Sequence, residues 1–439
     1  VQTGLDRVAT AADRVQTGDD RTTIEALIGD ATQLATPGDG TVTDAKVAGD
    51  AAIASTKLSV QQVGSVLVRA LSEKVNEIKS IRDYPGDTVT AKLMAAITYA
   101  NANGGNICFD FPTDSYPVPA GLSSIVTAPN VAFRGNGSTL AVGTGPVFRY
   151  GDGTAYADRG RVSNFTAEYT GADATSCLLR VYWAEEITLE QIRMDGGGYI
   201  LDAGLMPVGK FNSNIRLLDV TGAVDNIAGI PAVRRGATNA LMMDKVNIYN
   251  KYGSGAETDR NFLDDEEGNI STLQLSNMLI ERFYYGIKIV AAAGRLSVDM
   301  YMSNVVCDSC YNSGLVLYAT GADSFINSFE ISNSWFAAVN ANTTNYGAYI
   351  NAIDGGQIIL GDLTGNKYYG GDSASLYLGG ALRSVTVNEG QAFHFESVAA
   401  NAAALLIEDQ DGDMKGVVIN GGNWGGELPG AVTSVQADY

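Results

Sequence analysis

Three short segments decide the fold, and they read Leu273-Gln274-Leu275-Ser276-Asn277, Met300-Tyr301-Met302-Ser303-Asn304 and Phe329-Glu330-Ile331-Ser332-Asn333. In each segment two apolar residues alternate with others, and the second apolar residue, here called the anchor, precedes a short polar turn. Further anchors at a similar spacing are Phe133, Val162, Leu189, Leu218, Met243, Leu360, Val387 and Ile419. Neighbouring anchors lie 25 to 32 residues apart, and such a period is typical of solenoids, propellers and arrays.

A second strand follows each turn, often after a glycine. Examples are Gly286-Ile287-Lys288-Ile289, Gly314-Leu315-Val316-Leu317, Gly347-Ala348-Tyr349-Ile350 and Ser375-Leu376-Tyr377-Leu378. No helical period separates the strands, which argues against helical repeats. The pattern predicts a mainly β solenoid, a parallel β-helix whose coils stack about 4.8 Å apart. A β-propeller is the alternative, although its blades run longer, at roughly 40–50 residues.

The composition suits an all-β repeat and restricts the partners. The 439 residues include 51 glycines, and 45% are hydrophobic against 18% charged. The net charge of −20 repels phosphate, so we expect no nucleic-acid partner and favour a neutral or cationic surface, or a polysaccharide reached through hydrogen bonds. The sequence contains no apolar run of about 18 residues, so we expect no membrane insertion. No signal peptide opens the chain, which does not begin with Met, and we expect the numbering to start inside a longer polypeptide.

The cysteines do not predict a metal site. Cys307 and Cys310 form a lone CxxC, and the only histidine, His394, lies far along the chain. A zinc site would need two more ligands nearby. We therefore expect no metal and no cofactor, and interpret these cysteines as small buried residues in a reducing compartment.

The first 82 residues predict an oligomeric stem. In residues 1–37 the apolar positions alternate in steps of four and three, as in a coiled coil; they are Val1, Leu5, Val8, Ala12 and Val15. A solitary amphipathic helix is the alternative. Residues 38–60 are small and polar, and predict a linker of intertwined chains. Residues 61–82 resume heptad steps and predict a second short coiled-coil helix, through Val68, Leu71, Val75 and Ile78. We favour three chains, although short heptads do not fix the number.

Residues 83–140 predict the start of the β-helix, and residues 141–439 its rod. A helix is expected near 89–102, with Leu93, Ala96, Ile97 and Ala100 on one face. Gly104-Gly105 should end it. Such a helix would cap the open end of the solenoid, whose edge would otherwise be exposed.

These features together resemble a bacteriophage tailspike or tail fibre. The run Asp83-Tyr84-Pro85-Gly86-Asp87, the helix and Gly104-Gly105-Asn106-Ile107-Cys108-Phe109 resemble the opening of pectate-lyase-like right-handed parallel β-helices. Val42-Thr43-Asp44-Ala45-Lys46-Val47-Ala48 resembles a segment common in phage fibres, and the Val-Gln-Thr-Gly and Asp-Arg heptads resemble fibre stems. The resemblance implies a homotrimer in the virion tail, assembled in the host cytoplasm. Its N-terminal end would join virion tail proteins, and its rod would contact host surface polysaccharide.

Many spikes of this kind cleave the glycan that they bind, so the resemblance also implies a candidate glycoside hydrolase, a polysaccharide depolymerase. With one histidine in the chain, the chemistry would rest on carboxylates. Glu190, Asp219 and Asp244 follow the anchors of three consecutive coils. Stacked carboxylates about 5 Å apart would repel each other and raise at least one pKa, as an acid catalyst needs. The alternative is a structural ladder at the corner, because the same position holds Ser276, Ser303, Ser332 and Asn388 elsewhere.

A long insertion at residues 253–268 offers further carboxylates. Asp264 and Asp265 are its catalytic candidates, beside Glu257, Asp259, Glu266 and Glu267. Long loops on a rigid scaffold often build sites, but a block of acids is more often a solvated edge. Asp299 and Glu330 are alternatives on neighbouring coils, although their offsets from the anchors differ by two positions.

Sugar binding would use aromatic faces beside polar groups. The candidates for contact with the sugar are Trp183, Tyr284, Tyr285, Trp335 and Tyr368, with Tyr369 next to the last of them. Arg234 and Arg235 are candidates for contact with an acidic saccharide, or else a surface pair without function.

Two functions of different classes fit these observations. The first is an adhesin that attaches the virion to host cell-surface polysaccharide and cleaves the glycan through paired carboxylates. The alternative is a non-enzymatic fibre or adaptor that links the virion to a separate receptor-binding tip. A secreted polysaccharide lyase fits less well, because of the heptad stem and the missing signal peptide.

Overall fold

The computed structural model describes residues 59–61, 68–70, 78–121, 124–169, 173, 175–204, 210–225, 230–251, 260–265, 271–339, 345–370, 373–394, 403–409 and 413–424. The chain divides into two compact units, Val1–Val75 and Asn76–Tyr439. In the first unit, β1 (Ser59–Gln61) pairs antiparallel with β2 (Val68–Ala70).

The helix expected over residues 61–82 is wrong wherever the structure describes that segment. Val68–Ala70 is a strand, β3 (Ile78–Ser80) is another, and Ile81–Asp83 forms a 3₁₀ turn. β3 pairs in parallel with β4 (Ile107–Asp110), so backbone pairing with the first coil outweighs the heptad spacing of the side chains. The stem at 1–37 and nearly all of the linker at 38–60 lie outside the described residues.

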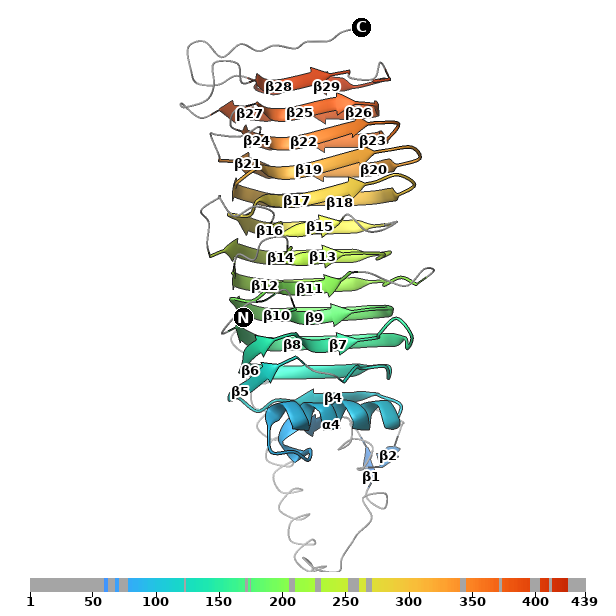
Figure 1. Cartoon of the computed structure of the whole chain (residues 1–439), viewed down its shortest axis with the longest axis vertical. Helices are drawn as coiled ribbons and strands as arrows, with labels where there is room; N and C mark the ends of the chain where they lie inside the picture. Colours follow the sequence, from blue (N-terminus) through green and yellow to red (C-terminus); the bar gives the residue numbers. More distant parts are fainter. Residues whose placement is uncertain are drawn as a thin grey trace, which may run out of the picture. The chain divides into compact units, whose positions relative to one another are not determined.

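The second unit is a parallel β-solenoid of the right-handed type and of about ten turns (Figure 1). One stack of strands, the second sheet, has ten members paired in parallel. In order they are β7 (Pro146–Tyr150), β9 (Cys177–Val181), β11 (Tyr199–Ala203), β13 (Val233–Arg235), β15 (Leu263–Asp265), β17 (Tyr285–Ala291), β19 (Ser313–Thr320), β22 (Tyr346–Ile353), β25 (Ala374–Gly380) and β28 (Ala403–Glu408).

The other stack, the first sheet, carries the anchors. After β3 and β4 it continues through β6 (Val131–Thr144), β8 (Ala157–Tyr169), β10 (Ala184–Asp195), β12 (Ile215–Val224), β14 (Leu241–Asn250), β16 (Leu273–Glu281), β18 (Leu296–Cys310), β20 (Phe325–Ser332), β23 (Gln357–Thr364), β26 (Leu382–Asn388) and β29 (Val418–Asn420). β5 (Ser115–Ala120) pairs with β6. The long β18 also pairs with β21 (Trp335–Ala338), which continues to β24 (Lys367–Gly370) and β27 (Gln391–His394).

The capping helix is confirmed as α4 (Val89–Ala102), the one α-helix among the described residues. The Thr88 hydroxyl accepts a hydrogen bond from the Ala91 N–H at 3.1 Å, which satisfies a free backbone donor of the first turn. The face expected to be apolar is buried in the core of the solenoid; it comprises Leu93, Ala96, Ile97 and Ala100. α4 lies across the β4 end of the stack (Figure 1) and covers apolar surface there.

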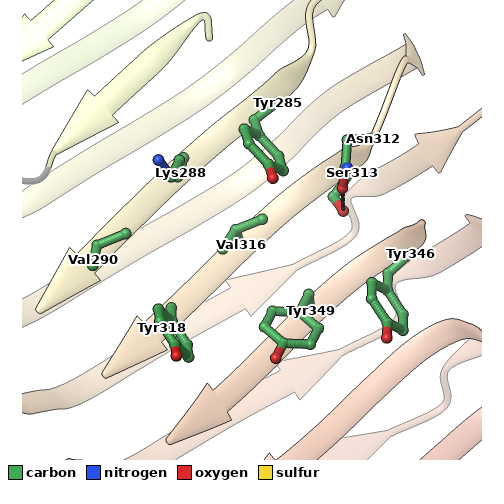
Figure 2. Close-up of a pocket in the computed structure, with 9 residues that line it drawn as sticks. All are labelled: Tyr285, Lys288, Val290, Asn312, Ser313, Val316, Tyr318, Tyr346 and Tyr349. Atoms are coloured by element: carbon green, nitrogen blue, oxygen red, sulfur yellow. Dashed lines mark hydrogen bonds between the residues drawn. The ribbon is translucent and has the colours of Figure 1, made fainter. Parts of the chain in front are cut away.

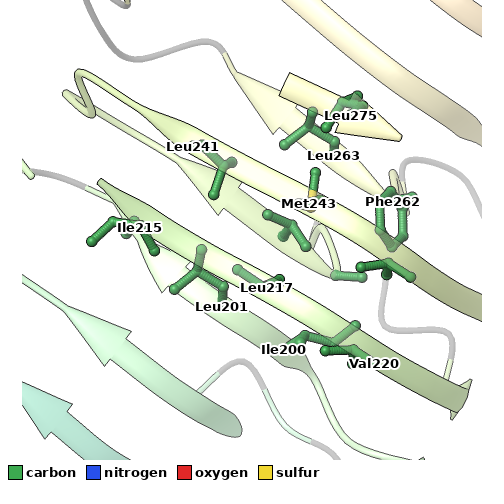
Figure 3. Packing of buried hydrophobic residues seen from close by; sticks show 14 of the residues in the cluster. Ile200, Leu201, Ile215, Leu217, Val220, Leu241, Met243, Phe262, Leu263 and Leu275 are labelled. Carbon is green, nitrogen blue, oxygen red and sulfur yellow. The ribbon is translucent and has the colours of Figure 1, made fainter. Parts of the chain in front are cut away.

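The anchors face a single core, as the alternation predicts, but two of them need correction. Leu189 pairs with Leu217 rather than Leu218, and Ile331 pairs with Leu363 rather than Leu360. Leu217 and Leu363 are fully buried, whereas Leu360 is 56% exposed. Figure 3 shows Leu217 packing among the anchors of the neighbouring coils. The step between anchors therefore varies more than the sequence suggests, because loops of different length separate them.

The two closely spaced cysteines are buried, as expected. Cys307 and Cys310 are buried free thiols of the core, and burial raises the pKa of both thiols far above the ordinary value. Within the described ranges, no group of three or more histidine, cysteine, aspartate or glutamate side chains is placed to hold a metal ion. No helix in the same ranges is long and apolar enough to cross a membrane.

Candidate functional site

One row of side chains runs along the outer face of the second sheet. Its members are in register on ten consecutive coils and alternate with buried residues along each strand: Arg149, Arg180, Asp202, Arg234, Asp264, Lys288, Val316, Tyr349, Tyr377 and Leu406. We call it the outer row. Its first six members, from Arg149 to Lys288, have charged side chains, and we call them the charged half. The other four are a valine, two tyrosines and a leucine, and we call them the aromatic half.

The aromatic half opens into a groove of about 480 Å³, here called the tyrosine groove. It spans three adjacent strands, β17, β19 and β22 (Figure 2). The lining residues are Tyr285, Lys288, Val290, Asn312, Ser313, Val316, Tyr318, Tyr346 and Tyr349. Aromatic faces with a few polar groups between them are what a ligand site of this size usually offers.

The tyrosine rings support one another. Tyr349 stacks on Tyr377 with ring centroids 4.8 Å apart and planes 15° apart. Tyr346 lies 4.9 Å from Tyr349 and 5.3 Å from Tyr377, and Tyr318 lies 6.2 Å from Tyr349. Rings held by such contacts keep their faces in place before a ligand arrives, which lowers the entropic cost of binding.

Polar groups of fixed orientation surround the rings. The Asn351 amide donates to the Tyr349 hydroxyl at 2.5 Å, and the Ser313 hydroxyl donates to the side-chain Oδ1 of Asn312 at 3.0 Å. Burial raises the pKa of the Tyr346 and Tyr349 hydroxyls. Both hydroxyls therefore keep their protons at neutral pH and can donate hydrogen bonds to the hydroxyls of a sugar.

The charged half centres on Asp202, which is fully buried. Its Oδ2 accepts from Arg180 Nε at 2.8 Å, and its Oδ1 lies 2.8 Å from Arg234 Nη2. The Tyr182 hydroxyl donates to Oδ2 at 3.2 Å. One carboxylate thus fixes two guanidinium groups on neighbouring coils.

The tyrosine groove and the outer row lie on a solenoid that has solved counterparts. No family model matches the sequence, and no curated protein matches it at a significant level. A mutant tailspike protein of E. coli bacteriophage HK620, in complex with a hexasaccharide, matches with a TM-score of 0.57. The chains are 16% identical, and the match covers 86% of this chain and 72% of the other. The chain has the fold of a phage tailspike.

A double mutant of the HK620 tailspike matches similarly, with a TM-score of 0.55 and 15% identity over 84% of this chain and 71% of the other. At these identities the likeness shows the tailspike fold alone. It confirms the parallel β-helix expected from the sequence.

Several residues predicted to bind sugar do lie on the outer face of the second sheet. Tyr285 lines the tyrosine groove, 5.5 Å from Lys288 Nζ to the ring centroid. Tyr284 lies beside it, 4.8 Å from the Tyr285 ring, and its hydroxyl accepts from the Asn312 amide at 3.2 Å. Arg234 belongs to the charged half of the outer row. The prediction of a contact with sugar stays a prediction for these three residues.

Two predicted contact residues are wrong, because they are buried. Tyr368 is fully buried and stacks on Phe336 with centroids 6.3 Å apart. Arg235 is also fully buried, and it donates to the backbone carbonyls of Thr238 and Ser271 at 3.1 and 2.6 Å. In each adjacent pair of similar residues, one side chain points inward because successive residues of a strand face opposite sides.

The two predicted tryptophans lie away from the tyrosine groove. Trp183 is half-buried at a corner, and Lys210 Nζ covers its ring 3.0 Å from the centroid. Trp335 on β21 lies 6.2 Å from Tyr369. The structure therefore does not bring these rings together with Tyr284 and Tyr285.

The carboxylate ladder of Glu190, Asp219 and Asp244 is wrong. Glu190 pairs with Leu218, and Leu218 with Asp244, so an apolar residue separates the two acids and Asp219 stands one position further on. Glu190 forms an ion pair with Arg161. Hydrogen bonds from Ser276 at 2.7 Å and Asn277 at 2.8 Å lower the pKa of Asp244, whereas the ladder would have raised it.

The insertion contributes less than expected within the described residues. Asp264 is part of the outer row and accepts from the Asn261 amide at 2.6 Å. Asp265 follows it as the last residue of β15. The other four acids of residues 253–268, namely Glu257, Asp259, Glu266 and Glu267, lie outside the described ranges.

A second, smaller groove of about 270 Å³ lies on the first sheet and contains Glu330, Tyr301 and Ser332. Glu330 is exposed, and its neighbour on the next coil is Asp362. Asp299 is not part of this pair, because Glu330 faces Tyr301 across the strands. The strand register therefore pairs Glu330 with Asp362, and not with Asp299 as expected from the sequence.

Sequence reasoning missed most of the tyrosine groove. The sequence-based candidates omit Tyr318, Tyr346 and Tyr349 of the groove and Tyr377 beside it, although Tyr349 and Tyr377 lie between apolar residues in the second strand of their coils. The sequence signal for this groove is a tyrosine at an outward strand position on consecutive coils.

Proposed function

We propose that this chain is a phage tail adhesin, which attaches the virion to a host cell-surface polysaccharide through the tyrosine groove. The observation that carries the proposal is the cluster of four mutually supporting tyrosine rings beside oriented amide and hydroxyl groups. Sugars present apolar ring faces together with hydroxyls, and aromatic rings with polar neighbours match both. The oligosaccharide held by the HK620 tailspike supports the same class of ligand.

The tyrosine groove can be tested with immobilised lipopolysaccharide and capsular polysaccharide from a panel of bacterial strains. We expect the full chain to bind at least one of them, and Tyr349→Ala to weaken that binding by roughly tenfold, equivalent to about 1.4 kcal/mol. Tyr249→Ala is the matched control, because Tyr249 is 42% exposed on the first sheet. Equal loss in both variants would place the contact elsewhere. Absence of binding across the panel would favour the adaptor.

The proposal includes a homotrimer in the virion tail, joined to other tail proteins by its N-terminal end. The heptad spacing of residues 1–37 supports it. Light scattering on the full chain should give about three times the chain mass of 46.1 kDa. A monomer in solution would contradict this part of the proposal but not the proposed binding of polysaccharide by the tyrosine groove.

Glycan cleavage is a second candidate activity, and one observation favours it. Glu330 and Asp362 are neighbours on adjacent coils, and strands about 4.8 Å apart suit the carboxylate separation of about 5–5.5 Å in retaining glycosidases. New reducing ends in the same polysaccharide incubations would reveal cleavage, and Glu330→Gln should abolish them. Cleavage that survives Glu330→Gln would exclude this pair.

A further inference from the structure

The charged half of the outer row has more positive than negative groups. Four of its members carry positive charge, namely Arg149, Arg180, Arg234 and Lys288, and two carry negative charge, Asp202 and Asp264, in a chain of net charge −20. Burial and repulsion from Arg180 lower the pKa of Arg149. Cations placed close together repel one another, and an anion bound among them would relieve that repulsion.

The guanidinium groups are also held in fixed positions. Arg180 lies 5.7 Å from the Tyr182 ring centroid and Arg234 lies 5.2 Å from that of Tyr199. A Cβ at position 204 would come within 2.4 Å of Arg234 Nε, so the glycine there makes room for the side chain.

Asp202 uses both carboxylate oxygens on the two guanidinium groups. The Arg180 and Arg234 side chains nevertheless remain 20% and 26% exposed. Their outer N–H edges can therefore take a second carboxylate from solvent, in the planar geometry that arginine offers.

We propose that the charged half of the outer row binds the carboxylate groups of an acidic polysaccharide whose sugars further along the same chain occupy the tyrosine groove. This inference rests on the proposed function and names the class of its ligand, a polymer of uronic-acid type. Six coil steps separate Tyr349 from Arg180, or about 30 Å at the usual spacing between strands. A single extended chain lying along the solenoid can reach both halves, and Lys288 stands where they meet.

The test compares an oligogalacturonide with its methyl ester, which has the same sugars and no charge. Calorimetric titration of the full chain at about 50 mM salt should show the acid binding roughly tenfold more tightly than the ester. The double variant R180Q/R234Q should bind both equally. R159Q/R161Q is the matched control, because these two arginines are 54% and 57% exposed on β8 of the first sheet, and it should keep the preference.

Equal affinity of the native chain for acid and ester, absence of binding of the acid, or a preference that survives R180Q/R234Q would each overturn the inference. Stronger binding of a single-stranded oligonucleotide than of the acid would overturn it too. If R180Q/R234Q fails to fold, as judged by its melting curve, K288Q replaces it and should reduce the preference. Loss of ester binding in Tyr349→Ala with no preference for the acid would leave the proposed function standing while the inference fails.

Discussion

At the scale of single residues, hydrogen bonds set the ionisation of Asp244. Ser276 and Asn277 both donate to its Oδ1, and they stabilise the charged form, so its pKa lies below the ordinary value. A carboxylate of this kind is a poor general acid at neutral pH. It contributes to stability instead, because the folded state binds its proton less readily than the unfolded chain does.

Ser276→Ala should change how stability depends on pH. With a native pKa below the unfolded value of about 3.9, Asp244 stabilises the fold fully above that value. The contribution is lost as pH falls through the native pKa. Removal of the Ser276 hydroxyl moves the native pKa upward, so the variant should lose less stability on acidification from about pH 5 to pH 3. Melting temperatures across this range measure the effect.

Ser303→Ala is the control for that measurement. Ser303 occupies the same position on the next coil and is not among the groups that shift the pKa of Asp244. The dependence of its melting temperature on pH should match that of the native chain. Parallel profiles for all three proteins would mean that Ser276 does not influence Asp244.

At the scale of the strands, register decides which of two similar residues supports the core. The apolar alternation predicts strands and their period, because one face of each strand must be buried. It does not decide between Leu217 and Leu218, which are adjacent and equally apolar. At Leu360 the backbone φ of 57° bends the strand, as it does at Ser328 and Ser384 on the neighbouring coils, and the register between the strands stays constant. A residue with this backbone conformation breaks the alternation, so the side chains that follow it change from one face of the strand to the other.

Leu363→Ala and Leu360→Ala test the corrected register directly. Leu363 is fully buried, so its truncation leaves a cavity and should destabilise the fold by about 2–5 kcal/mol. Leu360 is 56% exposed, so its truncation should change stability by only about 0.5 kcal/mol. Midpoints of guanidinium unfolding compare the two. A larger effect at Leu360 would restore the register inferred from the sequence.

Strand register also limits how much of the candidate site the sequence can predict. The prediction of Tyr285 rests on its aromatic ring, because sugar binding uses aromatic faces beside polar groups. Tyr349 and Tyr377 could have been found from their outward positions, yet their stacking depends on two strands being in register. Asp202 and Arg234 are neighbours in space but 32 residues apart in sequence, with β12 and its connections between them. Pairings of this kind follow from loop lengths that no apolar pattern encodes.

At the scale of the whole molecule, the charge distribution acts in opposite directions at long and short range. The net charge of −20 repels an acidic polysaccharide from a distance, whereas the charged half of the outer row attracts its carboxylates on contact. Salt screens the first effect beyond a Debye length of about 8 Å at physiological ionic strength. Partly buried ion pairs are screened less.

Association and dissociation rates of an oligogalacturonide should therefore both rise with salt. Raising the salt from about 10 to 150 mM shortens the Debye length from about 30 to 8 Å, so encounter becomes faster as long-range repulsion fades. Contacts with the outer row weaken at the same time, so dissociation also becomes faster. Biolayer interferometry gives both rates. R180Q/R234Q should keep the salt dependence of association and lose that of dissociation. An association rate that falls with salt would mean that the outer row, and not the net charge, governs the encounter.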